Sequence, residues 1–85
     1  MRIEKKVNKK YFDSILSGDK KFELRLADWD CAAGDILVLR EVDDDKVYTG
    51  RTLEKKVAYV IKTKDIDFFT KDDIEKYGFQ IISLD

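Results

Sequence analysis

Short apolar runs separated by charged residues are the feature that most constrains how this chain can fold. The two longest runs, residues 36–39 and 57–61, hold four and five apolar residues, whereas a helix that crosses a bilayer needs roughly 20. Runs of this length with turn residues on either side are typical of buried β-strands. Because 85 residues can build only one modest core, we expect a single domain over residues 1–85 with several short strands.

The first third of the chain predicts a strand, a helix and a second strand. Residues 2–7 alternate weakly between polar and apolar, and a helical apolar pattern follows. Asn8 is suited to the helix N-cap and Gly18 to the left-handed residue just past its end. Residues 20–26 alternate between charged and apolar side chains, which predicts a strand with one buried face.

The remainder predicts three or four further strands and one short helix. The expected features are a buried strand at 36–39, an acidic turn at 43–45 leading into a further strand, a strand within 55–64, a helix between Thr70 and Gly78, and a last strand at 79–84. Five to six strands and two short helices suit an α+β fold built as a small mixed β-barrel.

Composition excludes several classes of function. With no histidine, the chain has no Ser-His-Asp triad and no histidine-bound metal. Glycine motifs for phosphate are also missing, so we expect neither a cofactor nor a metal. A single cysteine, Cys31, favours a reducing, cytoplasmic location, and no apolar segment suggests a membrane or a signal peptide.

Charge is distributed unevenly along the chain. Residues 1–25 hold eight basic and four acidic side chains, although the whole chain carries −1. A local basic patch could therefore attract an anion. The overall balance argues against strong non-specific binding to nucleic acid, which needs many cationic contacts to phosphate.

Charged residues at the helix-to-strand junction are the main candidates for a binding site. They admit two interpretations: a solvated strand face with weak cross-strand ion pairs, or a polar site in which cations donate to an anion or carbonyl. Strict alternation puts Lys20 on the apolar face, so it joins the site only if the turn after Gly18 extends through residue 20. Trp29, in a polar turn, could stack on a base or cap the core. The candidate ligand-binding residues are Lys20, Lys21, Glu23, Arg25 and Trp29.

The stretches "YFDSILSGDKKFELR" and "AAGDILVLREVDDDKVYTGR" resemble the ASCH (activating-signal-cointegrator homology) domain family of the PUA-like superfamily. The resemblance is strongest to a small, uncharacterised bacterial and phage subset. The family motif Gly-x-Lys-x-x-Glu-x-Arg is matched by Gly18, Lys20, Glu23 and Arg25. The resemblance implies a PUA-like barrel whose cleft, beside the first helix, gathers these polar residues and binds RNA or modified nucleosides.

Three functions follow as hypotheses. The first is a module that binds RNA, a nucleotide or a modified nucleoside through Lys20, Glu23 and Arg25. The second is an amidohydrolase acting on an acylated nucleoside such as N4-acetylcytidine. One branch of the family has a lysine at the position of Lys20 and a threonine at the position of Glu23; here Lys20 would be the base and Glu23 would hold water. The third is a protein-interaction domain, a monomer or a weak homodimer joined through an edge strand.

Overall fold

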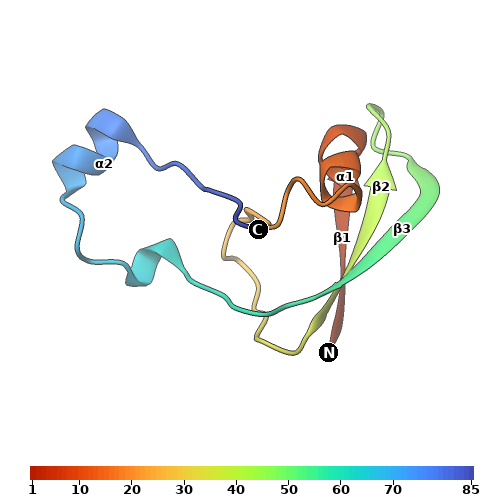
Figure 1. Cartoon of the computed structure of the whole chain (residues 1–85), viewed down its shortest axis with the longest axis horizontal. Coiled ribbons are helices and arrows are strands. Elements are labelled where there is room, and N and C mark those ends of the chain that lie inside the picture. The colour runs from red at the N-terminus through yellow and green to blue at the C-terminus, as the bar shows by residue number, and fades with distance from the viewer.

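The computed structural model describes residues 1–85 and contains one three-stranded β-sheet, two α-helices and one short 3-10 helix (Figure 1). The chain is therefore a small α+β protein, as the sequence predicts. In chain order the elements are β1 (Arg2–Asn8), α1 (Lys9–Leu16), β2 (Ile36–Val42), β3 (Tyr48–Lys56), η1 (Thr63–Asp65) and α2 (Lys71–Tyr77).

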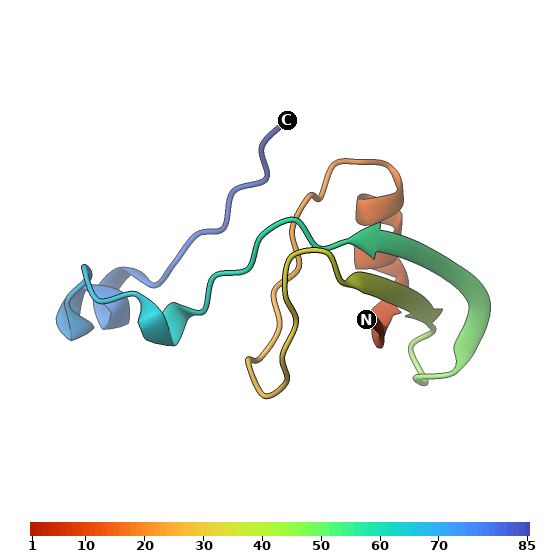
Figure 2. The same ribbon diagram turned by 90° about the horizontal axis from the view of Figure 1, so that it is seen from below.

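The sheet is mixed, with the strand order β1-β2-β3. β1 runs parallel to β2, and β2 runs antiparallel to β3. A parallel pair needs a long crossover, which α1 and residues 17–35 supply here. α1 packs against β1 and β2 (Figures 1 and 2). Both sheet edges, on β1 and on β3, have no neighbouring strand.

Helix α1 begins and ends where the sequence predicts. The Asn8 side chain accepts a hydrogen bond from the backbone N–H of Tyr11 at 3.1 Å, which caps the first turn. At the other end Gly18 has φ +88°, a left-handed conformation that glycine adopts without steric cost. This glycine lets the chain leave the helix and turn back toward the sheet.

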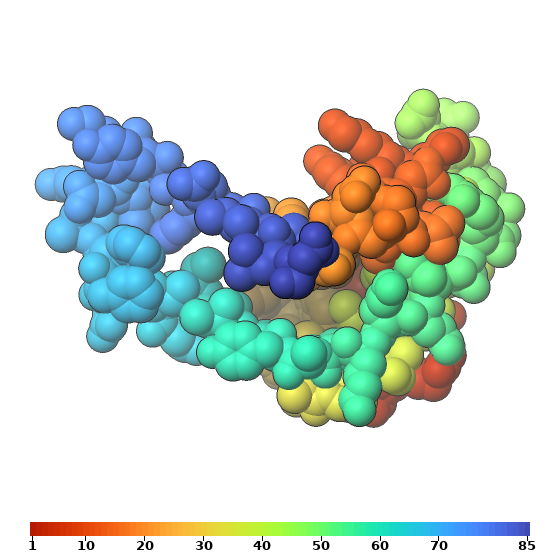
Figure 3. All heavy atoms as spheres, viewed as in Figure 1, coloured from red at the N-terminus to blue at the C-terminus, as the bar shows by residue number.

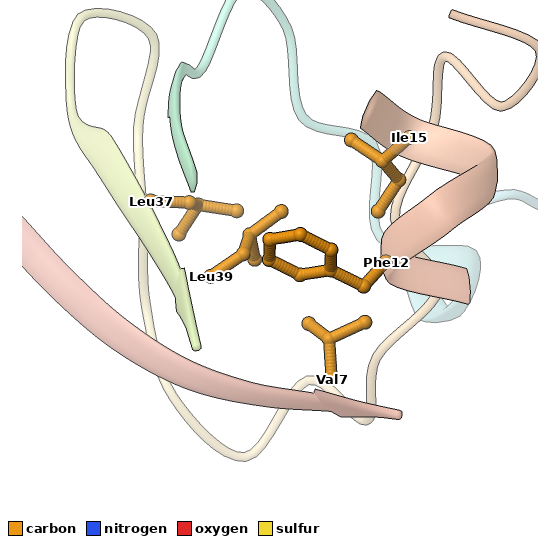
Figure 4. Packing of buried hydrophobic residues seen from close by; sticks show 5 residues of the cluster. All are labelled: Val7, Phe12, Ile15, Leu37 and Leu39. Atoms are coloured by element: carbon orange, nitrogen blue, oxygen red, sulfur yellow. The ribbon is translucent and has the colours of Figure 1, made fainter. Parts of the chain in front are cut away.

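The hydrophobic core lies between α1 and the sheet (Figure 4). Phe12 and Leu39 are its most enclosed side chains, each 1% exposed. Val7 precedes α1 and packs in the same cluster as Phe12, so the end of β1 and the start of α1 share one core. The full cluster is Val7, Phe12, Ile15, Leu37 and Leu39.

The sheet is not closed into a barrel. Residues 20–26, 57–61 and 79–84, which the sequence predicts as strands, are not part of the sheet. The last backbone hydrogen bonds next to the sheet join Val57 to Gly34 and Asp35, each at 2.8 Å, and the chain then turns away from the sheet.

Residues 58–85, the C-terminal arm, leave the sheet, and the end of the arm returns to the segment that follows α1, where Ser83 contacts Lys21 (Figures 2 and 3). Helix α2 forms within the arm as predicted: Thr70 Oγ1 accepts from the backbone N–H of Asp73 at 3.1 Å, and Gly78 follows its last turn. No residue of the arm is buried, and Tyr59 and Leu84 are 80% and 76% exposed. The arm therefore adds nothing to the core.

Candidate functional site

Lys20 lies in the turn that follows α1. Its backbone N–H donates to the carbonyl oxygen of Ser14 at 2.9 Å, so the chain is still folded back against the helix at this residue. Strict alternation over residues 20–26 would place Lys20 on the apolar face. Because residue 20 still belongs to the turn, that alternation does not apply to it. The Lys20 side chain is thereby free to face the same side as Glu23.

Lys20, Glu23 and Arg25 converge on one another. Lys20 Nζ lies 3.0 Å from Glu23 Oε1, and Arg25 Nε donates to Glu23 Oε2 at 3.0 Å. Their side chains are 15%, 19% and 30% exposed, respectively. One carboxylate thus holds two cations, each on its own oxygen, in a partly desolvated cluster where such charge-assisted hydrogen bonds are strengthened.

Arg25 also ties this cluster to the sheet. Its Nη2 donates to the backbone carbonyl oxygen of Lys6, in β1, at 2.9 Å. A guanidinium can make this bond and the Glu23 bond together because its donors point in fixed, different directions. Arg25 therefore holds residues 20–25 against β1 through its side chain, although these residues do not pair with β1 as a strand.

Two aromatic rings flank the ammonium group of Lys20. Its Nζ lies 4.9 Å from the ring centroid of Phe22 and 5.3 Å from that of Tyr11. Both distances fall within the range of cation–π attraction. The rings narrow the conformations open to Lys20 and provide flat apolar surface beside its charge.

These side chains line an open cavity of about 860 Å³, between the start of α1, the end of β1 and residues 19–25. Its volume lies within the range of small-molecule binding sites, and its lining combines five hydrophobic residues with eight polar or charged ones. Among the lining residues are the cations Lys6, Lys20, Arg25 and Lys46, the carboxylates Asp19 and Glu23, and the rings Tyr11 and Phe22.

Two of the predicted site residues do not line this cavity. Lys21 contacts the end of the arm: its backbone N–H donates to Ser83 Oγ at 2.9 Å, and its Nζ bonds Asp85. Trp29 packs against the core cluster, with Lys5 Nζ 3.9 Å from the centroid of its ring. The structure thus brings together Lys20, Glu23 and Arg25 and places Lys21 and Trp29 elsewhere.

Sequence reasoning missed a second charged cluster, centred on Arg51 in β3. Arg51 donates through Nε to Glu41 Oε1 at 3.0 Å and through Nη2 to Asp13 Oδ1 at 2.7 Å, and its guanidinium lies 4.6 Å from the Phe12 ring centroid. Glu41 is 4% exposed and also accepts from Thr49 Oγ1 at 2.6 Å. The cluster joins α1, β2 and β3 beside the core.

The pKa values of this cluster are shifted toward the charged forms. Hydrogen bonds from Arg51, and then from Thr49, hold the pKa of Glu41 below its ordinary value of 4.5. Hydrogen bonds from Lys9 and Arg51 likewise lower the pKa of Asp13 from 3.8, and those carboxylates raise the pKa of Arg51. All three groups are therefore ionised at neutral pH and compensate one another.

Replacing Arg51 with methionine, which keeps an apolar stem over Phe12, is expected to lower stability most at neutral pH. Lowered carboxyl pKa values stabilise the fold above pH 4.5, and this stabilisation is lost as the pH falls through the folded-state values. The difference in urea midpoint between wild type and Arg51→Met should therefore shrink between pH 5 and pH 3. A difference that stays constant with pH would contradict the role given to the ion pairs.

The remaining acidic and sulfur side chains form no metal-binding arrangement. No three histidine, cysteine, aspartate or glutamate side chains gather as a set of metal ligands. In the acidic turn, Asp43 Oδ1 instead accepts from the backbone N–H groups of Asp45 and Val47, at 2.9 and 3.0 Å. Cys31 is free and half-buried. None of the helices has the length and apolar character that crossing a membrane requires.

A small α+β domain with a polar cavity beside its first helix is the class that this geometry defines. The chain belongs to the DUF3850 family, described as a domain of unknown function, whose model matches residues 4–74. The cavity residues from Lys6 to Lys46 lie within that match.

A phage protein is similar to this chain. It is the "Uncharacterized 12.9 kDa protein in GpA 3'region" of Escherichia phage P2, 39% identical over 62 residues. The match covers 73% of this chain and 56% of the phage protein, so this chain corresponds to little more than half the length of that relative. No solved structure matches the chain.

Proposed function

We propose that this chain is an ASCH-type, PUA-like binding module whose cavity takes a nucleotide, a modified nucleoside or a segment of RNA. The observation that carries the proposal is the convergence of Lys20, Glu23 and Arg25 in one cavity. These three residues are the charged positions of the four-residue motif that contributes to the family resemblance. The sequence spacing of these residues alone would also fit a solvated strand face. On such a face the three side chains would not line one cavity together with two aromatic rings.

The chemistry of the cavity suits a base with polar substituents. Lys20 and Arg25 keep donors that Glu23 does not occupy, and these can bind phosphate or carbonyl oxygens. Tyr11 and Phe22 offer faces on which an unstacked base can lie, as in proteins that read single-stranded RNA. Glu23 holds the two cations in position and can accept from an exocyclic amino group.

Titration of purified protein at low salt tests this function. The probes are the four common ribonucleosides, their 5′-monophosphates, N4-acetylcytidine and short single-stranded RNA oligonucleotides. Calorimetry measures the binding of each probe. We expect saturable binding of at least one probe and an affinity at least about tenfold lower in Lys20→Ala, since a hydrogen bond to a charged group contributes roughly 1.5–3 kcal/mol.

Lys56→Ala is the matched control, because Lys56 ends β3 beside Ile36, the first residue of β2, and does not line the cavity. Its affinity should equal that of the wild type. Absence of saturable binding by every probe would reject the proposed function.

Hydrolysis of an acylated nucleoside is the alternative chemistry for the same cavity. Lys20 stands at the position of that branch's lysine, but both Glu23 oxygens already accept from cations. This arrangement favours binding over activation of water. Incubation with N4-acetylcytidine decides between them: we expect no release of cytidine above the Lys20→Ala control, and release above it would favour the enzyme.

The proposal includes completion of the sheet into a five- to six-stranded PUA-like barrel by residues 20–26, 57–61 and 79–84. Its support is the amount of exposed surface: the chain exposes 7157 Å², about 1,900 Å² more than expected for a folded chain of its mass. Its radius of gyration of 14.6 Å also exceeds the roughly 12 Å expected for this length. The contact of Ser83 with Lys21 already brings the arm beside residues 20–26.

Hydrogen exchange tests the barrel. Strand pairing should slow the exchange of backbone amides in residues 57–61 and 79–84 to rates comparable with those of β1, whereas an arm without partners exchanges as an unfolded peptide does. Light scattering at micromolar concentration gives the oligomeric state. It therefore distinguishes a barrel closed within one chain from strands paired between two chains. A dimer whose arm amides are protected would favour the edge-strand interaction domain instead.

A further inference from the structure

We infer that the cavity selects a nucleotide by its phosphate: a 5′-monophosphate should bind more tightly than the same nucleoside without it. This inference rests on the proposed function and narrows its ligand class. It follows from the balance of charge and hydrogen-bonding groups around the cavity.

Glu23 contributes little free negative charge to the cavity. Its two oxygens accept from Lys20 and from Arg25, both at 3.0 Å, so the carboxylate is compensated by two cations within its own cluster. Two cations share this one carboxylate, so the cluster keeps one net positive charge, since the other bond of Arg25 goes to a neutral carbonyl oxygen, that of Lys6. An anionic ligand would balance this surplus charge.

The charged residues around the rest of the cavity increase the surplus. Lys6 lines the cavity from β1 and Lys46 from the β2–β3 turn, against one further carboxylate, Asp19. The lining as a whole holds four cations and two carboxylates. An excess of cations in a concave site raises the local concentration of anions, which an uncharged nucleoside cannot exploit.

Lys46 occupies a backbone position that glycine or asparagine normally fills. It has φ +66° and is the one non-glycine residue of the chain with a positive φ. Its N–H donates to the Asp43 carbonyl oxygen at 2.9 Å, while the Asp43 side chain binds the N–H groups on either side of it. The turn therefore holds a lysine at the cavity in a conformation that costs free energy for a side chain with a Cβ.

The neutral donors of the cavity point to the same ligand. Tyr11 has a phenolic hydroxyl, and the side-chain NH₂ of Asn8 is free because only its oxygen is used to cap α1. Together with Lys20 and Arg25 they make the cavity rich in donors. A phosphate group, which is acceptor-rich and anionic, matches this set better than a sugar hydroxyl does.

Paired calorimetric titrations of nucleosides and their 5′-monophosphates test the inference, with inorganic phosphate and a 5′-phosphorylated RNA dinucleotide as further probes. We expect at least one monophosphate to bind at least tenfold more tightly than its nucleoside and than inorganic phosphate. The advantage should fall as salt rises. Tighter binding of the phosphorylated dinucleotide than of the mononucleotide would also support the inference and assign the phosphate to an RNA end.

Lys46→Gly is the decisive variant, because glycine suits the left-handed position and removes only the side chain. It should reduce the advantage of the monophosphate over the nucleoside severalfold, whereas the Lys56→Ala control, outside the cavity, should leave that advantage unchanged. Equal affinity for nucleoside and monophosphate would overturn the inference while leaving the proposed function intact. A total lack of binding would overturn both.

Discussion

Phe12→Ala should lower the free energy of unfolding by about 3–5 kcal/mol, the cost of deleting a buried phenylalanine from a core that cannot collapse around the gap. Phe12 is 1% exposed and packs with Val7, Ile15 and Leu39, so it joins α1 to two strands. Domains of this size have stabilities near the lower end of 5–15 kcal/mol. The variant should therefore be partly unfolded at 25 °C.

Urea denaturation followed by circular dichroism measures this effect, and Leu16→Ala on the same helix is the matched control. Leu16 is 54% exposed, so its truncation should cost no more than about 1 kcal/mol. Equal stability of the two variants would show that Phe12 is not at the centre of the core.

Arg25→Lys should weaken binding of a nucleotide almost as much as Arg25→Ala, by at least about tenfold, although it keeps the positive charge. Arg25 donates through Nε to Glu23 and through Nη2 to the Lys6 carbonyl oxygen. A lysine ammonium at the end of a flexible chain cannot reproduce both bonds in that geometry. Residues 20–25 would then lose their attachment to β1, and the cavity would lose its shape.

Calorimetry on both variants provides the measurement, and circular dichroism shows whether each remains folded. Because Arg25 is 30% exposed and lies outside the core cluster, both should retain their secondary structure. Wild-type affinity in Arg25→Lys would mean that Arg25 supplies charge alone.

Local sequence signals predicted the helices well. Asn8 and Thr70 cap α1 and α2 through their side-chain oxygens, and Gly18 and Gly78 follow the helix ends with positive φ. Each of these signals involves residues within one turn of each other. These capping signals can therefore be recognised in the sequence without knowledge of the tertiary structure.

Strand pairing was less predictable. The apolar run at 57–61 indicates a strand, yet periodicity does not specify the strand beside which it pairs. In the structure Val57 still bonds Gly34 and Asp35, but residues 58–61 continue past β3 with no strand beside them, and Tyr59 is 80% exposed. A barrel requires contacts between segments far apart in the sequence, for which this chain offers no local signal.

The candidate site was predictable in part. The motif singled out Lys20, Glu23 and Arg25. Alternation alone put Lys20 on the apolar face, and the sequence left open whether the turn after Gly18 extends through residue 20, as it does in the structure. Lys46 had no local signal, since its place in the cavity follows from the β2–β3 turn and the packing of residues 19–25.

The cluster at Arg51 did have a signal that was overlooked. Glu41 stands two residues after Leu39, so the alternation of β2 places its carboxylate on the core side. A buried carboxylate needs a partner, and Arg51 lies in the strand that pairs with β2. A search for charged residues at positions where the alternation predicts a buried apolar side chain would have found Glu41.

The central claim, that the cavity beside α1 is the ligand site, is tested most directly by mapping a bound nucleotide with NMR. Backbone amide shifts of ¹⁵N-labelled protein would be followed during titration with a 5′-monophosphate. The account predicts that the largest changes fall at Tyr11, at residues 19–25 and at Lys46, which surround the cavity. Changes confined to the arm or to the outer face of the sheet, with these amides unmoved, would contradict it.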